Sequence, residues 1–194
     1  RRARTAYGAE QLTERWSRLP VAVRIGLIYL AARLVTFGFF AAAAALSGPG
    51  SRFGADASVG SLLMGWDAQW YWWVAANGYP AVLPLTDAGL VAENAWAFMP
   101  LYPWISQGLG FVVGGWPLGA MIVSLVAGYG ASLALYRLLR QRMDAAAATW
   151  AVVFFAAGPL AGLFHVAYAE TLFLLLLFLS LDALLRRRYG WLYL

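Results

Sequence analysis

The stretch VAVRIGLIYLAARLVTFGFFAAAAAL, residues 21–46, decides the fold class of this chain. Its only charged residues are Arg24 and Arg33, and it is longer than the about 20 apolar residues that a helix needs to cross a hydrocarbon core. The whole chain of 194 residues is 62% hydrophobic and 12% charged, whereas soluble domains carry about 25% charged residues. The sequence therefore predicts an integral membrane protein.

Later apolar segments extend this pattern to an all-α, polytopic transmembrane helical bundle. Residues 1–20 are polar and basic and predict a cytoplasmic segment, and residues 21–194 form the membrane domain. Within that domain, Gly158-Pro159 predicts a kink. The chain does not begin with Met and ends in an apolar run, so we expect the N-terminal portion of a longer protein. After the first span, we expect spans at about 117–139, 145–164 and 171–185, and the start of another at 191.

The net charge of +5 comes from arginines that stand mostly at the ends of apolar segments. This is the positive-inside pattern of membrane proteins, so we expect no nucleic-acid partner. The arginines of 137–142 and 186–188 predict the cytoplasmic side, and loop 47–116, with Arg52 as its only cation, predicts the exterior. Within that loop, the apolar segment 98–113 is short for a span and contains two prolines, which favours an interfacial or re-entrant helix.

The exterior loop contains WDAQWYWWVAANGYP, which begins at Trp66. Trp and Tyr gather where hydrocarbon meets headgroups, because each ring is apolar at one end and forms hydrogen bonds at the other. The run therefore predicts an interfacial helix at about 66–77 that holds the carboxylate of Asp67 at the membrane surface. Two interpretations of Asp67 stay open from the residues alone: a helix N-cap, or a general base.

Other candidate residues surround this helix in the predicted topology. Glu93 and Asn94 precede the aromatic helix on the same side, with Asn94 as its expected cap. Arg33 lies near the middle of the first span, where a charge costs at least ~2.5–3.5 kcal/mol and needs a partner. That partner is either a buried carboxylate or a lipid phosphate. The motif HVAYAE places His165, Tyr168 and Glu170 at the mouth between two spans.

Metal chemistry has no positive support in the sequence. The chain has one histidine and no cysteine, and its carboxylates lack the spacing of a metal site. We expect no cofactor and assign no metal ligand, while a divalent ion bound by carboxylates stays open. The absence of cysteine also excludes disulfides and thiol catalysis.

The chain resembles the PIG-V-like mannosyltransferases, the family of the GPI mannosyltransferase 2 enzymes and their bacterial relatives. Three motifs carry the resemblance in order: WDAQWYWWVAANGYP, NAWAFMPLYP and AYAETLFLL. They cover about Trp66 to Leu177; YAETLF is a variant of the family's Tyr-Ser-Glu-type sequence, and the family's proteins have more spans than we predict here. The resemblance implies a GT-C glycosyltransferase fold and maps the family's catalytic loop carboxylate onto Asp67.

The resemblance further implies a polyprenyl-phosphate sugar donor, typically mannose, and a lipid or lipid-linked glycan as acceptor. We expect an inverting enzyme of a bacterial plasma membrane with its active site on the exterior face, completed by a C-terminal half. The alternative is a non-catalytic membrane subunit or a lipid-carrier transporter. Beside catalytic Asp67, the candidate donor- and acceptor-binding residues are Trp66, Tyr71, Glu93, Asn94, Arg33, Arg52, His165, Tyr168 and Glu170.

Overall fold

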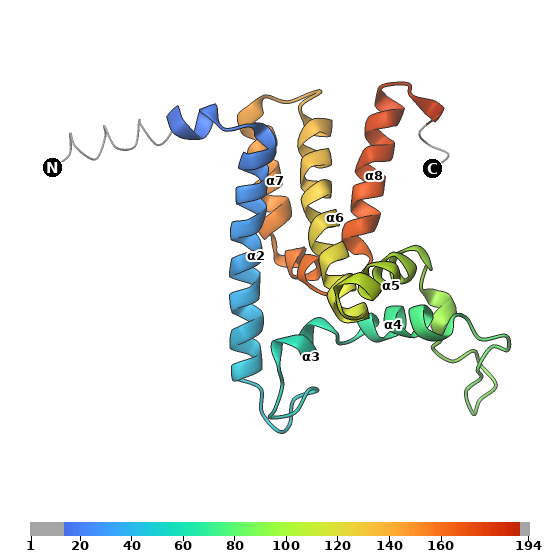
Figure 1. Cartoon of the computed structure of the whole chain (residues 1–194). Helices are drawn as coiled ribbons and strands as arrows, with labels where there is room; N and C mark the ends of the chain where they lie inside the picture. The colour runs from blue at the N-terminus through green and yellow to red at the C-terminus, as the bar shows by residue number, and fades with distance from the viewer. Residues whose placement is uncertain (1–13, 191–194) are drawn as a thin grey trace.

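The computed structural model describes residues 14–190, and their regular structure is helical (Figure 1). This confirms the prediction of an all-α chain for the described part, where an isolated bridge between Leu85 and Val91 is the only β pairing. The named elements are α2 (Val21–Ala45), α3 (Val59–Leu63), α4 (Asp67–Asn77), η1 (Ala95–Ala97), α5 (Leu101–Val113), α6 (Trp116–Leu139), α7 (Ala145–Ala157), η2 (Pro159–His165) and α8 (Glu170–Leu185).

Two expectations from the sequence fall wholly or partly outside the described residues. Most of the predicted cytoplasmic segment 1–20 precedes residue 14, and its described part is helical at 14–18. The span expected to begin at 191 lies beyond the last described residue.

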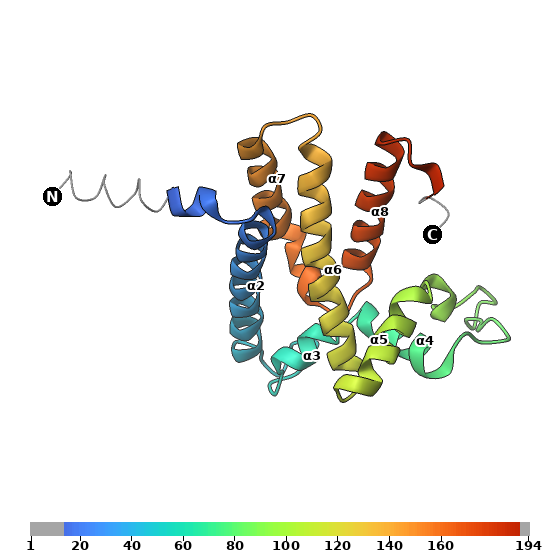
Figure 2. The same cartoon turned by 45° about the horizontal axis from the view of Figure 1, so that its top comes forward.

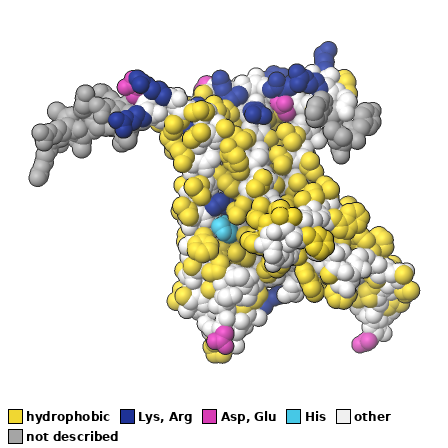
Figure 3. Space-filling model, in the orientation of Figure 1, with side chains coloured by type: hydrophobic (Ala, Val, Ile, Leu, Met, Phe, Trp, Pro, Cys, Tyr) yellow, Lys and Arg dark blue, Asp and Glu magenta, His cyan; other side chains and the backbone are white. Residues whose placement is uncertain are grey.

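Helices α2, α6, α7 and α8 run side by side, and α3, α4 and α5 lie across one end of them (Figures 1 and 2). The central helix is α6, which contacts α2, α5, α7 and α8. We call the end at which α6 and α8 finish the basic end, because arginine side chains gather there above a mostly apolar belt (Figure 3). We call the opposite end, where α3, α4 and α5 lie, the aromatic end. The arginine clusters at 137–142 and 186–188, at the ends of α6 and α8, therefore lie on the same side of the bundle.

Two helices are long and apolar enough to cross a membrane, and a bent pair is a third candidate. The first two are α2 and α6, with 25 and 24 residues, and the pair is α7 with η2. The segment expected at 171–185 forms α8, whose 16 residues are fewer than the about 20 that a straight span needs. Whether α8 crosses the membrane stays a prediction.

The break between α7 and η2 lies at Gly158-Pro159, as the sequence predicts. The two helices are bent by 69°, and Gly158 has an extended backbone with φ −66° and ψ 170°. A residue before proline is driven out of the helical region by the proline ring, and proline itself has no N–H to donate. The break therefore follows from the sequence, and it ends α7 inside the bundle.

The hairpin of α5 and α6 holds the aromatic end against the bundle. Thirteen residues make α5 about 20 Å long, which is less than the about 30 Å of a hydrocarbon core; its interfacial position stays a prediction. Small residues on α6 allow the close approach, since a Cβ on Gly119 would overlap the carbonyl oxygen of Ser106 on α5. Gly115 makes the connecting turn with φ 132°, a conformation that favours glycine.

Candidate functional site

A strained turn places Asp67 at the start of α4. Trp66 has φ 50° and ψ −122°, and the Ala68 N–H donates to the Gly65 carbonyl at 3.1 Å, which closes the turn. Residues other than glycine rarely adopt such backbone angles, and doing so costs about 1–3 kcal/mol. Strain of this size persists only where the surroundings enforce it, and it is concentrated at functional sites.

The loop before α3 enforces this turn from the side. The Phe53 ring packs edge-on against the Trp66 indole with centroids 5.0 Å apart, and it occupies the space that a Cβ on Gly65 would need. The Arg52 guanidinium lies 5.8 Å from the centroid of the same indole, within the range of a cation–π contact. Trp66 is thus held from two sides, and Asp67 follows directly.

The Asp67 carboxylate is exposed and has no hydrogen-bond donor among the described residues. The N-cap position belongs to Trp66, and no side chain caps α4. The interpretation of Asp67 as a side-chain cap therefore does not describe its position. Instead, its backbone N–H donates to the Tyr168 hydroxyl at 3.2 Å, which ties α4 to the turn before α8.

A cleft of about 650 Å³ opens beside Asp67. It collects four of the residues proposed from the sequence, together with further tryptophans and one amide that sequence reasoning missed. That amide belongs to Gln69. Its position two residues after Asp67, within the aromatic run, is the sequence feature that could have identified it as a cleft residue. The lining residues are Arg52, Trp66, Asp67, Gln69, Trp70, Trp72, Trp73 and Glu93.

Three tyrosines from the three sequence motifs meet behind the cleft. The Tyr71 ring of α4 lies 5.2 Å from the Tyr102 ring of α5 and 6.3 Å from the Tyr168 ring, between centroids. Ser124 of α6 joins them, because its Oγ donates to the Tyr168 carbonyl at 3.1 Å and lies 2.8 Å from the Tyr102 hydroxyl. Burial raises the pKa of Tyr71 to about 12.

Glu170 faces a different cavity from Asp67. It begins α8, and its Oε2 is buried without a hydrogen-bond partner. Burial raises the pKa of the Glu170 carboxyl, and the nearby negative charge of Asp67 raises it further. Glu170 lines two mostly apolar cavities, one of about 340 Å³ that includes Tyr71 and Phe173 and one of about 390 Å³ beside η2. The charge of Asp67 therefore acts on Glu170, but Glu170 does not line the Asp67 cleft.

Arg33, His165 and Asn94 have structural partners instead of facing the cleft. Arg33 is buried and donates to the carbonyls of Ala156 and Ala161, both at 2.6 Å. It lies about 18 Å along α2 from Val21. The sequence analysis expected a carboxylate or a phosphate as the partner of Arg33. The structure shows two backbone carbonyls in that role.

His165 is buried, and its ring centroid lies 6.0 Å from that of Phe37 and 6.1 Å from that of Phe40. Asn94 is a cap, but of η1 and not of the longer aromatic helix expected from the sequence: its Oδ1 accepts from the Trp96 N–H at 3.0 Å, whereas Pro100 holds the N-cap position of α5.

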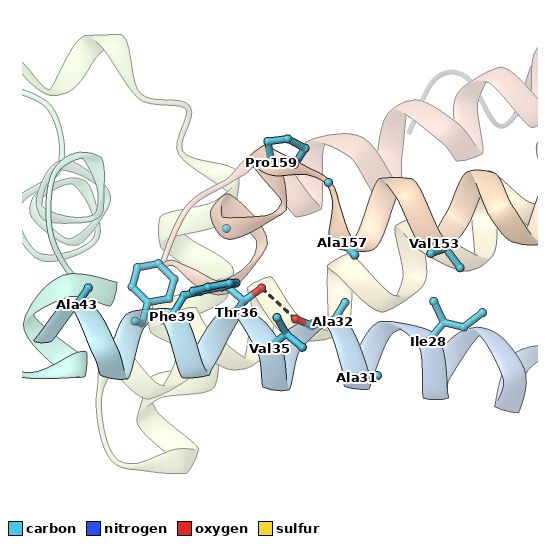
Figure 4. Close-up of a pocket in the computed structure, with 13 residues that line it drawn as sticks. Ile28, Ala31, Ala32, Val35, Thr36, Phe39, Ala43, Val153, Ala157 and Pro159 are labelled. Atoms are coloured by element: carbon cyan, nitrogen blue, oxygen red, sulfur yellow. Dashed lines mark hydrogen bonds between the residues drawn. The ribbon is translucent and has the colours of Figure 1, made fainter. Parts of the chain in front are cut away.

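Another cavity is an apolar groove, and none of its lining residues is acidic or basic. It has a volume of about 710 Å³ and lies between α2 and the α7–η2 pair (Figure 4). Its only polar side chain belongs to Thr36, whose hydroxyl donates to the Ala32 carbonyl at 2.9 Å. Across the described residues, no group of three or more acidic, histidine or cysteine side chains could hold a metal ion.

No protein-family model, curated protein or solved structure matches this chain. We therefore infer function from the residues of the cleft.

Proposed function

We propose that this chain carries the catalytic face of an integral-membrane glycosyltransferase. The enzyme transfers a sugar from a polyprenyl-phosphate donor to a hydroxyl group of a lipid or lipid-linked glycan. The sugar that we propose is mannose. One observation carries the proposal: a single cleft combines the unpaired carboxylate of Asp67 with a cation and with indole rings. A base, a phosphate-binding cation and aromatic faces for a sugar are the groups that this reaction needs.

In the proposed mechanism, Asp67 removes the proton from the acceptor hydroxyl. The hydroxyl oxygen forms a bond to the anomeric carbon from one face, and the bond from that carbon to the phosphate oxygen breaks on the other face. The polyprenyl phosphate leaves with the electron pair, so the configuration inverts. The indoles of Trp70 and Trp73 offer flat apolar faces for the sugar ring, and Glu93 and Gln69 offer hydrogen-bond partners for its hydroxyl groups.

Arg52 is the cation assigned to the donor phosphate. It is the only positively charged residue between positions 47 and 115, all of which the structure describes. Its guanidinium rests against Trp66, next to Asp67. A guanidinium matches two phosphate oxygens at once, and it stabilises the charge that develops on the leaving group. Arg33 has no part in this mechanism, because its terminal nitrogens already bond two backbone carbonyls.

The transfer reaction itself tests the proposal. We expect the full-length protein in liposomes to move radiolabelled mannose from polyprenyl-phosphate mannose into a lipid-extractable product, and to leave a nucleotide-linked mannose unused. Failure of all lipid-linked donors with several acceptor lipids would contradict the proposal. Movement of the labelled donor between leaflets, with no product formed, would instead favour the lipid-carrier transporter.

The proposed orientation places the aromatic end outside and the basic end in the cytoplasm. Because the chain has no cysteine, single cysteines report this without background. We expect Ser58→Cys to react with a membrane-impermeant thiol reagent in intact cells, and Met143→Cys, in the exposed loop after α6, to react only after permeabilisation. Reaction at position 143 in intact cells would reverse the orientation and remove the exterior active site.

A further inference from the structure

Residues 80–92, which we call the arm, connect α4 to η1 and are almost entirely apolar. Asp87 is the only charged residue in the sequence PAVLPLTDAGLVA. The apolar side chains of the arm are nevertheless open to the surroundings: Val82 is 83% exposed, Leu85 63% and Leu90 68%. Such a concentration of exposed aliphatic side chains is typical of an interaction site.

The arm is an ordered hairpin. The Thr86 N–H donates to the Leu90 carbonyl at 2.7 Å, and the Ala92 N–H donates to the Pro84 carbonyl at 2.9 Å. These bonds, around the isolated bridge between Leu85 and Val91, keep the two sides of the arm together near its tip, with Asp87 in the connecting turn. The apolar side chains are therefore displayed by a defined backbone.

Aromatic side chains fix the base of the arm to the aromatic end of the bundle. The Tyr79 and Trp96 rings stack with centroids 4.4 Å apart, and the Trp96 indole N–H donates to the Pro80 carbonyl at 3.0 Å. The Tyr79 hydroxyl donates to the Phe98 carbonyl at 2.6 Å. The direction of the arm is thus set by the same aromatic segment that contains α4 and α5.

The arm extends sideways, beyond α4 and away from α2, α6, α7 and α8, at the aromatic end (Figures 1 and 2). Near its base lie indoles that are themselves exposed: Trp96 is 57% exposed and Trp73 47%. Exposed tryptophans beside apolar spans are typical of the layer where hydrocarbon meets headgroups. The arm therefore leaves the bundle at the level expected of the membrane surface.

We infer that the arm is a membrane anchor that inserts its aliphatic side chains into the interfacial layer of the lipid bilayer. Asp87, at the tip, stays among the headgroups and water. A lipid surface fits better than a protein partner because protein interfaces carry a polar rim and hydrogen-bond donors, whereas the exposed side chains of the arm are aliphatic apart from Thr86 and Asp87. The inference stands independently of the proposed sugar transfer, although the arm leads directly to Glu93 and so fixes the depth of the cleft.

Spin labels on single cysteines measure the depth of the arm in nanodiscs of phosphatidylcholine and phosphatidylglycerol. Oxygen concentrates in hydrocarbon and a charged or hydrated nickel chelate is excluded from it, so the ratio of the two accessibilities increases with depth. We expect this ratio to be several-fold higher for labels at Leu85→Cys and Leu90→Cys than for the matched label at Asp87→Cys. Val82→Cys reports on the same surface if a label at either leucine disturbs the hairpin, and Met143→Cys supplies the value for water.

Equal ratios at positions 82, 85, 87 and 90, all close to the value at 143, would overturn the inference. Labels that are open to the nickel chelate in nanodiscs but protected in native membranes would also overturn it, and would identify a protein partner instead. Neither result bears on the transfer assay, so failure of the anchor and failure of the proposed function are distinguishable.

Discussion

Asp67→Asn is expected to reduce sugar transfer by roughly 10²–10⁴-fold, the usual contribution of a general base. The amide has nearly the same size as the carboxylate but cannot accept the proton of the acceptor hydroxyl. Because no described group donates a hydrogen bond to this side chain, the folded state should be little affected, by about 0.5 kcal/mol or less. The measurement is the initial rate of transfer from polyprenyl-phosphate mannose, made on variants that elute as folded protein.

Asp56→Asn is the matched control for this variant. Asp56 is an exposed carboxylate of the same loop, and it does not line the cleft, so its loss should leave the rate unchanged. Transfer within a few-fold of the parent for Asp67→Asn would show that the base lies elsewhere. Glu93 would then be the next candidate because it shares the cleft, ahead of Glu170, which faces another cavity.

Arg33→Met is expected to lower the free energy of unfolding by roughly 2–4 kcal/mol, because two hydrogen bonds from a charged donor are lost. The carbonyls of Ala156 and Ala161 would remain buried without a partner at the break between α7 and η2. Arg33→Lys should fall between Met and the parent, since an ammonium group keeps the charge but cannot span both carbonyls as the planar guanidinium does. Denaturation in mixed micelles, followed by far-UV circular dichroism, measures the difference.

Arg24→Met provides the comparison on the same helix. Arg24 lies near the basic end of α2, is only partly buried, and donates no hydrogen bond within the described residues. Its replacement should change the stability much less. A different result would contradict the structural role of Arg33: parental stability of Arg33→Met together with a raised KM for the donor would indicate a bound phosphate.

Periodic and compositional signals predicted most of the helices. The ends of α2 and α6 lie within one residue of the predicted boundaries, because long apolar segments end where Gly, Pro or Arg begins. The helix that begins at Asp67 could also be predicted, from the aromatic run. The capping preference of Asn predicted that Asn94 is a cap, but not that it caps η1. The sequence analysis placed Arg52, Asp67 and Glu93 in one loop, and the structure brings these three residues into one cleft.

Other features depend on contacts that a sequence pattern does not contain. The partners of Arg33 are backbone carbonyls, and these are invisible to a search for oppositely charged side chains. The backbone angles of Trp66 oppose local preference and depend on Phe53, which lies thirteen positions earlier. The hairpin of residues 80–92 lacks the alternation of a half-buried strand, so its order follows from the Tyr79–Trp96 stack at its base.

The break after α7 has an electrostatic consequence for the apolar layer. Each helix end carries about half an elementary charge from its aligned peptide dipoles, negative at the C-terminus and positive at the N-terminus. The guanidinium of Arg33 meets the C-terminus of α7, and the acidic side chain of Glu170 stands at the N-terminus of α8. Each ionisable group thus has a complementary fractional charge built from backbone. The C-terminus of a helix that ends at Gly-Pro can therefore balance the charge of a buried arginine beside it. A membrane sequence that has both features needs no acidic side chain as the partner of that arginine.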